Sequence, residues 1–384
     1  MSEVVELLQE LIRIPSLNPQ GDAGFAQTGE DKLARFTGDY LEKLGMEVEF
    51  QNVEENRPNV IGRLRSKKPK HHIILGPHLD TVSVRGMTID PFGGAIKDGR
   101  VYGRGACDTK GSMAAIMVAL NELVRSKKLP SSTDIWFTGL MGEESGNDGI
   151  AFLMSSDFFA KKGFKPDFGI AGEPTDLRIV HRHKGSLWFK VKTRGRSCHA
   201  SRPDLGENAI LKMQKAIDYL AGGLPKSYDH LKDPLLGKCT FSITTIRGGS
   251  KINIIPETCR VEIDHRSLPQ MDHAEVIARI RQALPDCELE VTSDRPGLDT
   301  PSNNPFIQKL LGVLANHKPR LPQKDFLIGA PWFADCSLMA KGGIPAIAFG
   351  PGSIEQAHTK DEYICIDELE KGAAIFGEFF KTLD

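Results

Sequence analysis

The sequence has almost no charge imbalance and no long apolar run. Its 384 residues carry 49 Lys and Arg against 50 Asp and Glu, for a net charge of −1. A surface that binds nucleic acid or an anionic membrane needs a clear excess of basic residues, and a membrane-spanning helix needs about 20 consecutive apolar residues. We therefore expect neither nucleic acid nor a membrane among the partners of this protein.

Cysteine is scarce and lacks paired spacing. The seven cysteines are an odd number, and no C-x-x-C pair occurs. This usage favours reduced thiols over a disulfide framework and predicts a cytoplasmic protein. The first residues, Met1 to Glu10, form an acidic amphipathic pattern, whereas a secretory signal is basic and then apolar.

Common catalytic signatures are absent as well. The sequence contains no G-x-x-x-x-G-K-[ST] loop, no H-E-x-x-H helix and no G-x-S-x-G elbow. The run Gly103-x-Gly105-x-x-Asp108 ends in aspartate where a dinucleotide-binding loop has glycine or alanine. Cys198 and His199 are adjacent in the chain, a spacing at which a nucleophile and its base rarely face each other. Nucleotide binding and a cysteine nucleophile are therefore disfavoured.

The chain is longer than one hydrophobic core usually serves, so we expect two domains. Residues 1–180 alternate strands and helices, which predicts an α/β fold with a mixed, mostly parallel sheet flanked by helices. Residues 181–295 instead show long alternating strands and two helices, which predicts a smaller inserted α+β domain. Residues 296–384 then return to the first domain.

Side chains that can bind metals follow the predicted strands of the first domain. His78 and Asp80 follow the strand His71 to Leu75, and two glutamates follow the strand Asp134 to Leu140. Several carboxylates at one sheet edge repel one another strongly unless cations neutralise them. By itself H-x-D is more typical of a hydrogen-bonded histidine at a strand end, so the metal interpretation depends on the whole set. The candidates are His78, Asp80, Asp108, Glu143, Glu144, Glu173 and His358.

Five segments of the sequence resemble the motifs of the M20 metallopeptidase family. This family includes acetylornithine deacetylase, succinyl-diaminopimelate desuccinylase, aminoacylase and glutamate carboxypeptidase. The segments occur in the family's order: His78-Leu-Asp80, Gly103-Arg-Gly-Ala-Cys-Asp108-Thr-Lys-Gly111, Gly142-Glu143-Glu144-Ser-Gly146, Gly172-Glu173-Pro174 and Gly350-Pro-Gly-Ser-Ile-Glu-Gln-Ala-His358. The resemblance implies a zinc exopeptidase-like catalytic domain, an inserted lid and dimerisation domain, and a homodimer formed through that domain.

By this resemblance, two divalent metal ions bind in each subunit. His78 and Glu173 would hold one ion, Glu144 and His358 would hold the other, and Asp108 would bridge them. Zinc is the expected metal, with cobalt or manganese as substitutes, because each ion would have one histidine and several oxygen ligands. The family often has a cis peptide bond directly after the bridging aspartate.

The same resemblance assigns catalytic roles to three residues. Glu143 would act as general base, taking a proton from the attacking water to give the hydroxide, and Asp80 would orient His78. His199, in the segment Arg196-Ser-Cys-His199, would donate a hydrogen bond to the oxyanion of the tetrahedral intermediate. The alternatives are a solvated loop carboxylate for Glu143 and a surface histidine for His199.

Three further residues match family positions that bind substrate: Arg266, Asn253 and Gly352. An arginine fork suits a planar carboxylate, although Arg266 fits a strand-end ion pair equally well. The Pro-Trp-Phe run at residues 331–333 predicts an apolar or aromatic pocket for the substrate side chain.

We therefore expect a zinc-dependent amidohydrolase that cleaves the amide bond of an N-acyl amino acid, in the manner of acetylornithine deacetylase. The alternative is a metallo-exopeptidase or dipeptidase of the same family, acting on short peptides with a free C-terminal carboxylate. A non-catalytic binding module is a third interpretation, which the intact ligand set and Glu143 disfavour. The C-terminal motif favours the deacetylase branch, whereas the aromatic run at 331–333 disfavours ornithine as the side chain.

Overall fold

The computed structural model describes residues 1–20, 27–317 and 322–383, and it divides into two compact units. Unit 1 comprises Met1–His181, Thr300–Ile328 and Ala334–Asp384, and unit 2 comprises Arg182–Asp299 and Gly329–Phe333. Each unit has its own hydrophobic core. Within the described ranges, no helix combines the length and apolar character that crossing a membrane requires.

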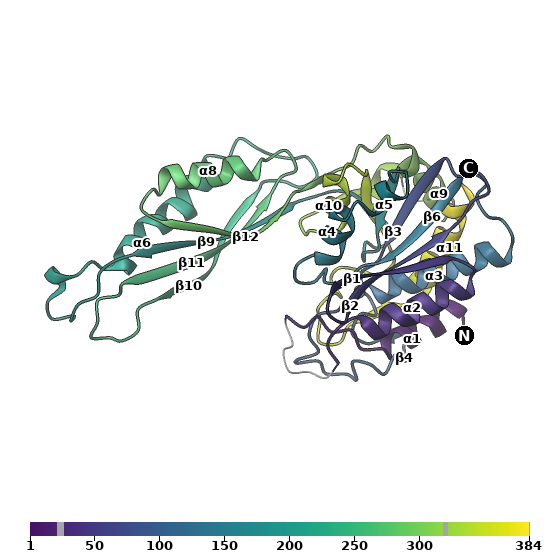
Figure 1. The fold of residues 1–384 in the computed structure, drawn as a ribbon, viewed down its shortest axis with the longest axis horizontal. Coiled ribbons are helices and arrows are strands. Elements are labelled where there is room, and N and C mark those ends of the chain that lie inside the picture. The colour runs from purple at the N-terminus through teal and green to yellow at the C-terminus, as the bar shows by residue number, and fades with distance from the viewer. Residues whose placement is uncertain (21–26, 318–321, 384) are drawn as a thin grey trace. The chain divides into compact units, whose positions relative to one another are not determined.

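Unit 1 is built on a mixed sheet flanked by helices, as the sequence predicts, but only the central strands of this sheet pair in parallel (Figure 1). The strand order is β1-β2-β6-β3-β7-β15-β8, and β6, β3, β7 and β15 run parallel to one another. The strands are β1 (Glu47–Glu54), β2 (Arg57–Leu64), β3 (His71–Gly76), β6 (Thr133–Gly139), β7 (Phe168–Ala171), β8 (Ile179–His183) and β15 (Ala346–Ala348). A smaller sheet contains β4 (Ala95–Lys97), β5 (Arg100–Tyr102) and β16 (Tyr363–Cys365).

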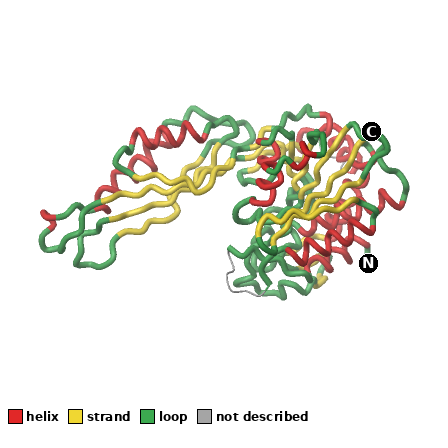
Figure 2. Tube along the Cα trace, viewed as in Figure 1, coloured by secondary structure: helices red, strands yellow, loops and turns green. Residues whose placement is uncertain are grey.

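Helices cover both faces of this sheet (Figures 1 and 2). On β6, Ile135 and Phe137 pack into the core formed with α1, α3 and α11, whereas Trp136 points the other way and contacts α5. A strand buried on both faces is apolar throughout, which explains the run Ile135 to Phe137. The helices are α1 (Glu3–Ile12), α2 (Asp31–Lys43), α3 (Lys110–Arg125), α4 (Asp148–Ser155), α5 (Phe158–Lys161), α9 (Pro305–His317), α10 (Cys336–Lys341) and α11 (Ile366–Lys381), with a 3-10 turn η3 (Gln323–Phe326).

The parallel pairing of β6, β3 and β7 brings the loops after these strands together. The strands end at Gly139, Gly76 and Ala171, so the segments that follow them leave the same edge of the sheet. The loop that contains Asp108 leads directly into α3, which begins at Lys110. The fold therefore gathers four of the motifs recognised in the sequence at one edge.

Unit 2 contains an antiparallel sheet of strand order β10-β11-β9-β12. One face of β11 is buried against α6 and α8, and its residues alternate between buried and partly exposed. The elements are β9 (Gly185–Arg194), η1 (Pro203–Leu205), α6 (Ala209–Asp218), η2 (Tyr219–Gly223), α7 (Leu224–Lys226), β10 (Thr240–Gly248), β11 (Thr258–Ser267), α8 (His273–Ala283), β12 (Glu288–Arg295), β13 (Leu298–Asp299) and β14 (Leu327–Ala330), which begins in unit 1.

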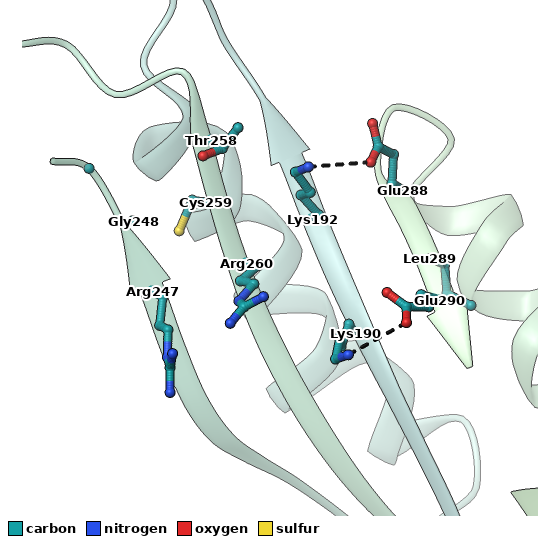
Figure 3. A pocket seen from close by; sticks show the side chains of 11 residues that line it. Lys190, Lys192, Arg247, Gly248, Thr258, Cys259, Arg260, Glu288, Leu289 and Glu290 are labelled. Atoms are coloured by element: carbon teal, nitrogen blue, oxygen red, sulfur yellow. Dashed lines mark hydrogen bonds and ion pairs between the residues drawn. The ribbon is translucent and has the colours of Figure 1, made fainter. Parts of the chain in front are cut away.

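The open face of the unit 2 sheet carries a pocket of about 630 Å³ (Figure 3). Lys190 pairs there with Glu290 at 3.5 Å, and Lys192 pairs with Glu288 at 3.8 Å. The residues predicted from the sequence to bind metal or substrate are not among those that line it. The candidate chemistry lies instead at the sheet edge of unit 1.

Candidate metal centre

His78 stands two residues beyond the end of β3 and is almost fully buried. Its Nδ1–H donates to the main-chain carbonyl of Asp80 at 2.8 Å, which directs Nε2 toward Asp108 Oδ1 at 2.9 Å. With Nδ1 protonated, neutral His78 has a lone pair on Nε2 that would face a lone pair on Asp108 Oδ1. A proton or a metal ion must therefore lie between these two atoms. Burial lowers the pKa of His78, but the hydrogen bond and charge of Asp108 outweigh burial, so the pKa is raised well above its ordinary value.

Asp108 contacts two histidines through different oxygens. Oδ1 lies 2.9 Å from His78 Nε2, and Oδ2 lies 3.3 Å from His358 Nε2. His358 Nε2 is also 3.0 Å from Glu144 Oε2. The ligand atoms of His78, Asp108 and Glu144 all lie within 4.8 Å of one another, a spacing that could hold a metal ion. The peptide bond between Asp108 and Thr109 is cis, as the family resemblance implies.

The carboxylates at this edge outnumber the histidines. Burial raises the pKa of Glu143 and Glu173 well above the ordinary value, and neighbouring carboxylates raise it further. Burial and the charge of Asp108 raise the pKa of Glu144 to about 6, against the opposing effect of His358. The pKa values of these carboxyl groups are raised because too little positive charge lies nearby to stabilise their ionised forms. Bound cations would supply that charge, so the cluster suits a metal site. The residues present therefore fit divalent metal ions.

Glu173 and His358 stand outside the group of three closely spaced ligands. Glu173 follows β7, and its charge raises the pKa of both His78 and Glu143, so it faces the same cluster. His358 has a half-exposed side chain, and its hydrogen bonds to Asp108 and Glu144 raise its pKa to about 10. All five predicted metal ligands thus belong to one electrostatic cluster in unit 1.

Asp80 is fully buried, but its carboxylate does not make the hydrogen bond that orients His78. That bond comes from the Asp80 main chain, and the carboxylate oxygen stays 3.6 Å from His78 Nδ1. The two carboxylate oxygens instead accept the main-chain N–H groups of Glu143 and Glu144, each at 3.0 Å, and Oδ2 also accepts Asn18 Nδ2 at 2.8 Å. Asp80 therefore fixes the loop that carries both glutamates.

Asn147 is a residue that the sequence does not single out. Its amide donates to Glu143 Oε1 at 3.2 Å and to Asp335 Oδ1 at 2.7 Å, and it is 1% exposed. Asn147 has a positive φ of 55°, a conformation that asparagine adopts more readily than most residues. A turn at Gly146-Asn147 was a possible signal for the conformation, but no local pattern indicates the contact with Asp335, 188 residues away.

Gly352 has a backbone reason to be glycine. Its φ is 94°, and a Cβ at this position would lie 2.6 Å from Cys107 Sγ. Its carbonyl accepts the N–H of Asp176 at 2.7 Å. The glycine lets the C-terminal motif pass close to Cys107, next to Asp108. Its predicted contact with substrate stays a prediction.

The other predicted site residues, His199, Asn253 and Arg266, belong to unit 2. His199 is exposed and hydrogen-bonds Ser201 Oγ through Nδ1 at 2.7 Å, and the carbonyl of Asn253 accepts the N–H of Ala200. Arg266 forms the ion pair that was its alternative role, with Nε 2.9 Å from Asp264 Oδ1. Both side chains of this pair remain partly exposed. The roles of Arg266, Asn253 and His199 toward a substrate stay predictions.

The aromatic residues 332 and 333 surround His183 within unit 2. The ring centroids of Trp332 and Phe333 lie 6.4 and 5.5 Å from that of His183, which is fully buried. Arg295 lies over the Phe333 ring at 5.5 Å. These contacts show an aromatic cluster at the residues where the sequence predicts the substrate side-chain pocket.

Comparisons with known proteins agree with this arrangement. A sequence profile of Peptidase family M20/M25/M40 matches residues 74–382. An acetylornithine deacetylase of Proteus mirabilis (strain HI4320) is 30% identical over 98% of this chain and 96% of its own length. A probable succinyl-diaminopimelate desuccinylase of Staphylococcus aureus (strain MSSA476) is 27% identical over the same shares. The crystal structure of an M20 family metallo-carboxypeptidase, Sso-CP2 from Sulfolobus solfataricus, has a TM-score of 0.81 at 21% identity and covers 99% of both chains.

Proposed function

The chain belongs to Peptidase family M20/M25/M40 and is a metal-dependent amidohydrolase, and from this premise we propose that it removes the acyl group from an N-acyl amino acid. The similarity to an acetylornithine deacetylase over nearly the whole chain supports deacylation. The substrate in this proposal is a small molecule with a free carboxylate. The proposed location is the cytoplasm, which the odd number of cysteines and the lack of C-x-x-C spacing support.

The observation that carries the proposal is the position of Asp108 between two histidines. Its two oxygens lie 2.9 Å from His78 and 3.3 Å from His358, as in a ligand that bridges two metal ions. We propose that His78 and Glu173 hold one ion and that Glu144 and His358 hold the other. Zinc is the proposed metal, and cobalt or manganese could replace it. When bound, such ions polarise the amide carbonyl and lower the pKa of the attacking water to about 7.

Glu143 is the proposed general base. The main-chain N–H of Glu143 donates to Asp80, and Glu143 Oε1 accepts a hydrogen bond from Asn147, so the carboxylate is held in place. Glu143 is not one of the three closely spaced ligands His78, Asp108 and Glu144. In the reaction it takes a proton from the attacking water and delivers it to the amine nitrogen that leaves.

Residues of unit 2 complete the proposal. His199 is proposed to donate to the oxyanion, and Arg266 and Asn253 to bind the substrate carboxylate together with Gly352 of unit 1. The exposure of His199 and Asn253, on segments joined by the hydrogen bond from Ala200, supports a role at a surface that meets substrate. We also propose that unit 2 serves as the lid and as the dimerisation surface of a homodimer.

A hydrolysis panel tests the function. The protein would be stripped with a chelator, reloaded with zinc or cobalt, and assayed on N-acetyl, N-succinyl and N-formyl amino acids beside dipeptides. We expect metal-dependent release of free amino acid from an N-acyl substrate. Faster cleavage of dipeptides would identify the exopeptidase or dipeptidase alternative instead. Protein that holds metal and cleaves none of these amides would contradict the proposal.

A further inference from the structure

Glu362 is a buried carboxylate that the proposed mechanism does not use. In the sequence it follows His358 and directly precedes β16, and its exposed fraction is 0%. In sequence it is 254 residues away from Asp108, yet it contacts the main chain of that residue. The contact joins the C-terminal motif to the glycine-rich motif around Asp108.

The Glu362 side chain accepts hydrogen bonds with both oxygens. Oε1 accepts the N–H groups of Cys107 at 2.9 Å and of Asp108 at 3.0 Å. Oε2 accepts Arg104 Nη1 at 2.7 Å and the N–H of Gly105 at 3.0 Å. Its main-chain carbonyl also accepts the N–H of Gly103 at 3.0 Å. These donors all belong to residues 103–108, so Glu362 accepts hydrogen bonds from four of the six main-chain N–H groups in this loop.

The backbone geometry of residues 103–108 explains why this loop needs a carboxylate to accept its N–H groups. Gly103 and Gly105 have positive φ angles of 154° and 81° and no side chains that could fix the loop by packing. The N–H of Asp108 points to Glu362, whereas its carboxylate points to His78 and His358. Charge-assisted hydrogen bonds to buried N–H groups are strong and directional, so they set the orientation of the peptide units next to Asp108.

We infer that Glu362 is a positioning residue for the metal centre: through the main chain of residues 103–108 it sets the direction of the Asp108 carboxylate. The inference rests on the proposed function only in taking Asp108 as a metal ligand. Residues that hold metal ligands in place typically change metal affinity by about 10–100-fold when they are replaced. Glu362 is expected to act on metal binding to this extent, whatever the substrate is.

The test compares Glu362→Gln with a matched control, Asp134→Asn. Asp134 is also a fully buried carboxylate with four hydrogen bonds, from Arg63 and Ser66, but it lies near the start of β6, at the opposite end of the strand from the metal centre. In Glu362→Gln an amide NH₂ faces two N–H donors, so the loop must shift. We expect zinc to bind about 10–100-fold more weakly to this variant in competition with a chelator. The visible absorption spectrum of the cobalt form should change as well.

The control separates positioning from general stability. Asp134→Asn should lower the melting temperature but keep the zinc affinity and the cobalt spectrum of the unaltered protein. Native zinc affinity in Glu362→Gln, or an equal loss in both variants, would overturn the inference. If Glu362→Gln does not fold, Glu362→Asp keeps the charge but shortens the side chain by one methylene, and the same criteria apply to it.

Faster hydrogen exchange at residues 105, 107 and 108 in the metal-free variant would support the inference, and unchanged exchange would count against it. These measurements use no substrate. Their outcome therefore does not depend on whether the protein proves to be a deacylase.

Discussion

Replacing Asn147 with glycine should shift the pH dependence of catalysis. The side-chain amide is the donor that Glu143 Oε1 and Asp335 Oδ1 share, at 3.2 and 2.7 Å. Glycine adopts the φ of 55° at this position without strain, so Asn147→Gly removes the amide and leaves the turn intact. Alanine would add backbone strain and confuse the two effects.

The expected magnitude follows from the hydrogen bond that Glu143 loses. A hydrogen bond to a charged group contributes about 1.5–3 kcal/mol, and one pKa unit corresponds to about 1.4 kcal/mol. Because the 3.2 Å contact is at the long end of the normal range, we take the lower value, which is about one unit. A donor stabilises the ionised carboxylate, so its removal raises the pKa of Glu143. Below this pKa the ionised fraction falls about tenfold, and kcat/KM should fall with it.

The assay is the pH profile of kcat/KM for the zinc-loaded protein on its best N-acyl substrate. The acidic limb of Asn147→Gly should move up by about one pH unit and rejoin the profile of the unaltered protein at higher pH. Asn56→Gly is the matched control, since Asn56 has a φ of 58° in the exposed turn between β1 and β2. An unchanged acidic limb at equal metal content would refute the role of Asn147. An equal loss of rate at every pH would refute it too.

Three other predictions follow from the site and from unit 2. Glu143→Ala should lower kcat by about 10²–10⁴-fold while the metal content, measured by elemental analysis, stays unchanged; parallel loss of both would make Glu143 a ligand. His199→Ala should lower kcat by about 10²–10³-fold if His199 donates to the oxyanion, and unchanged turnover would remove it from the mechanism. Burial lowers the pKa of His265 from its ordinary 6.5 to about 4. Between these two pH values the unfolded chain binds a proton at His265 and the folded chain does not, so the free energy of unfolding must fall as the pH falls from 6.5 to 4. The loss is about 3 kcal/mol, and His265→Phe, which can keep the stacking on Phe241, should flatten urea midpoints plotted against pH; an unchanged slope would contradict the assignment.

The secondary structure near the site could be predicted because it depends on local patterns. The strand predicted at His71 to Leu75 is β3, and the strand predicted at Asp134 to Leu140 is β6. Side chains at strand ends could be predicted to converge because neighbouring parallel strands end at the same edge of a sheet. The candidate ligands therefore came from positions in the sequence, before any distance between them was known.

The contacts that hold these side chains in place could not be predicted in the same way. Asp80 was expected to orient His78; its main-chain carbonyl accepts the hydrogen bond from His78, whereas its carboxylate binds the loop of Glu143. Whether a carboxylate faces an imidazole two residues away or an N–H group 63 residues away depends on how the loops pack. Composition and periodicity contain no information on that choice.

By itself, the sequence determined which residue types stand at the ends of which strands, because each strand or helix is encoded in its own few residues. It also determined the family, through motifs that recur in a fixed order. Only the tertiary structure decided that Asn147 joins Glu143 to Asp335 and that Glu362 holds the loop of Asp108. Asn147 is 188 positions away from Asp335, and Glu362 is 254 positions away from Asp108. A buried polar group takes whichever partner the folded chain places within hydrogen-bond distance.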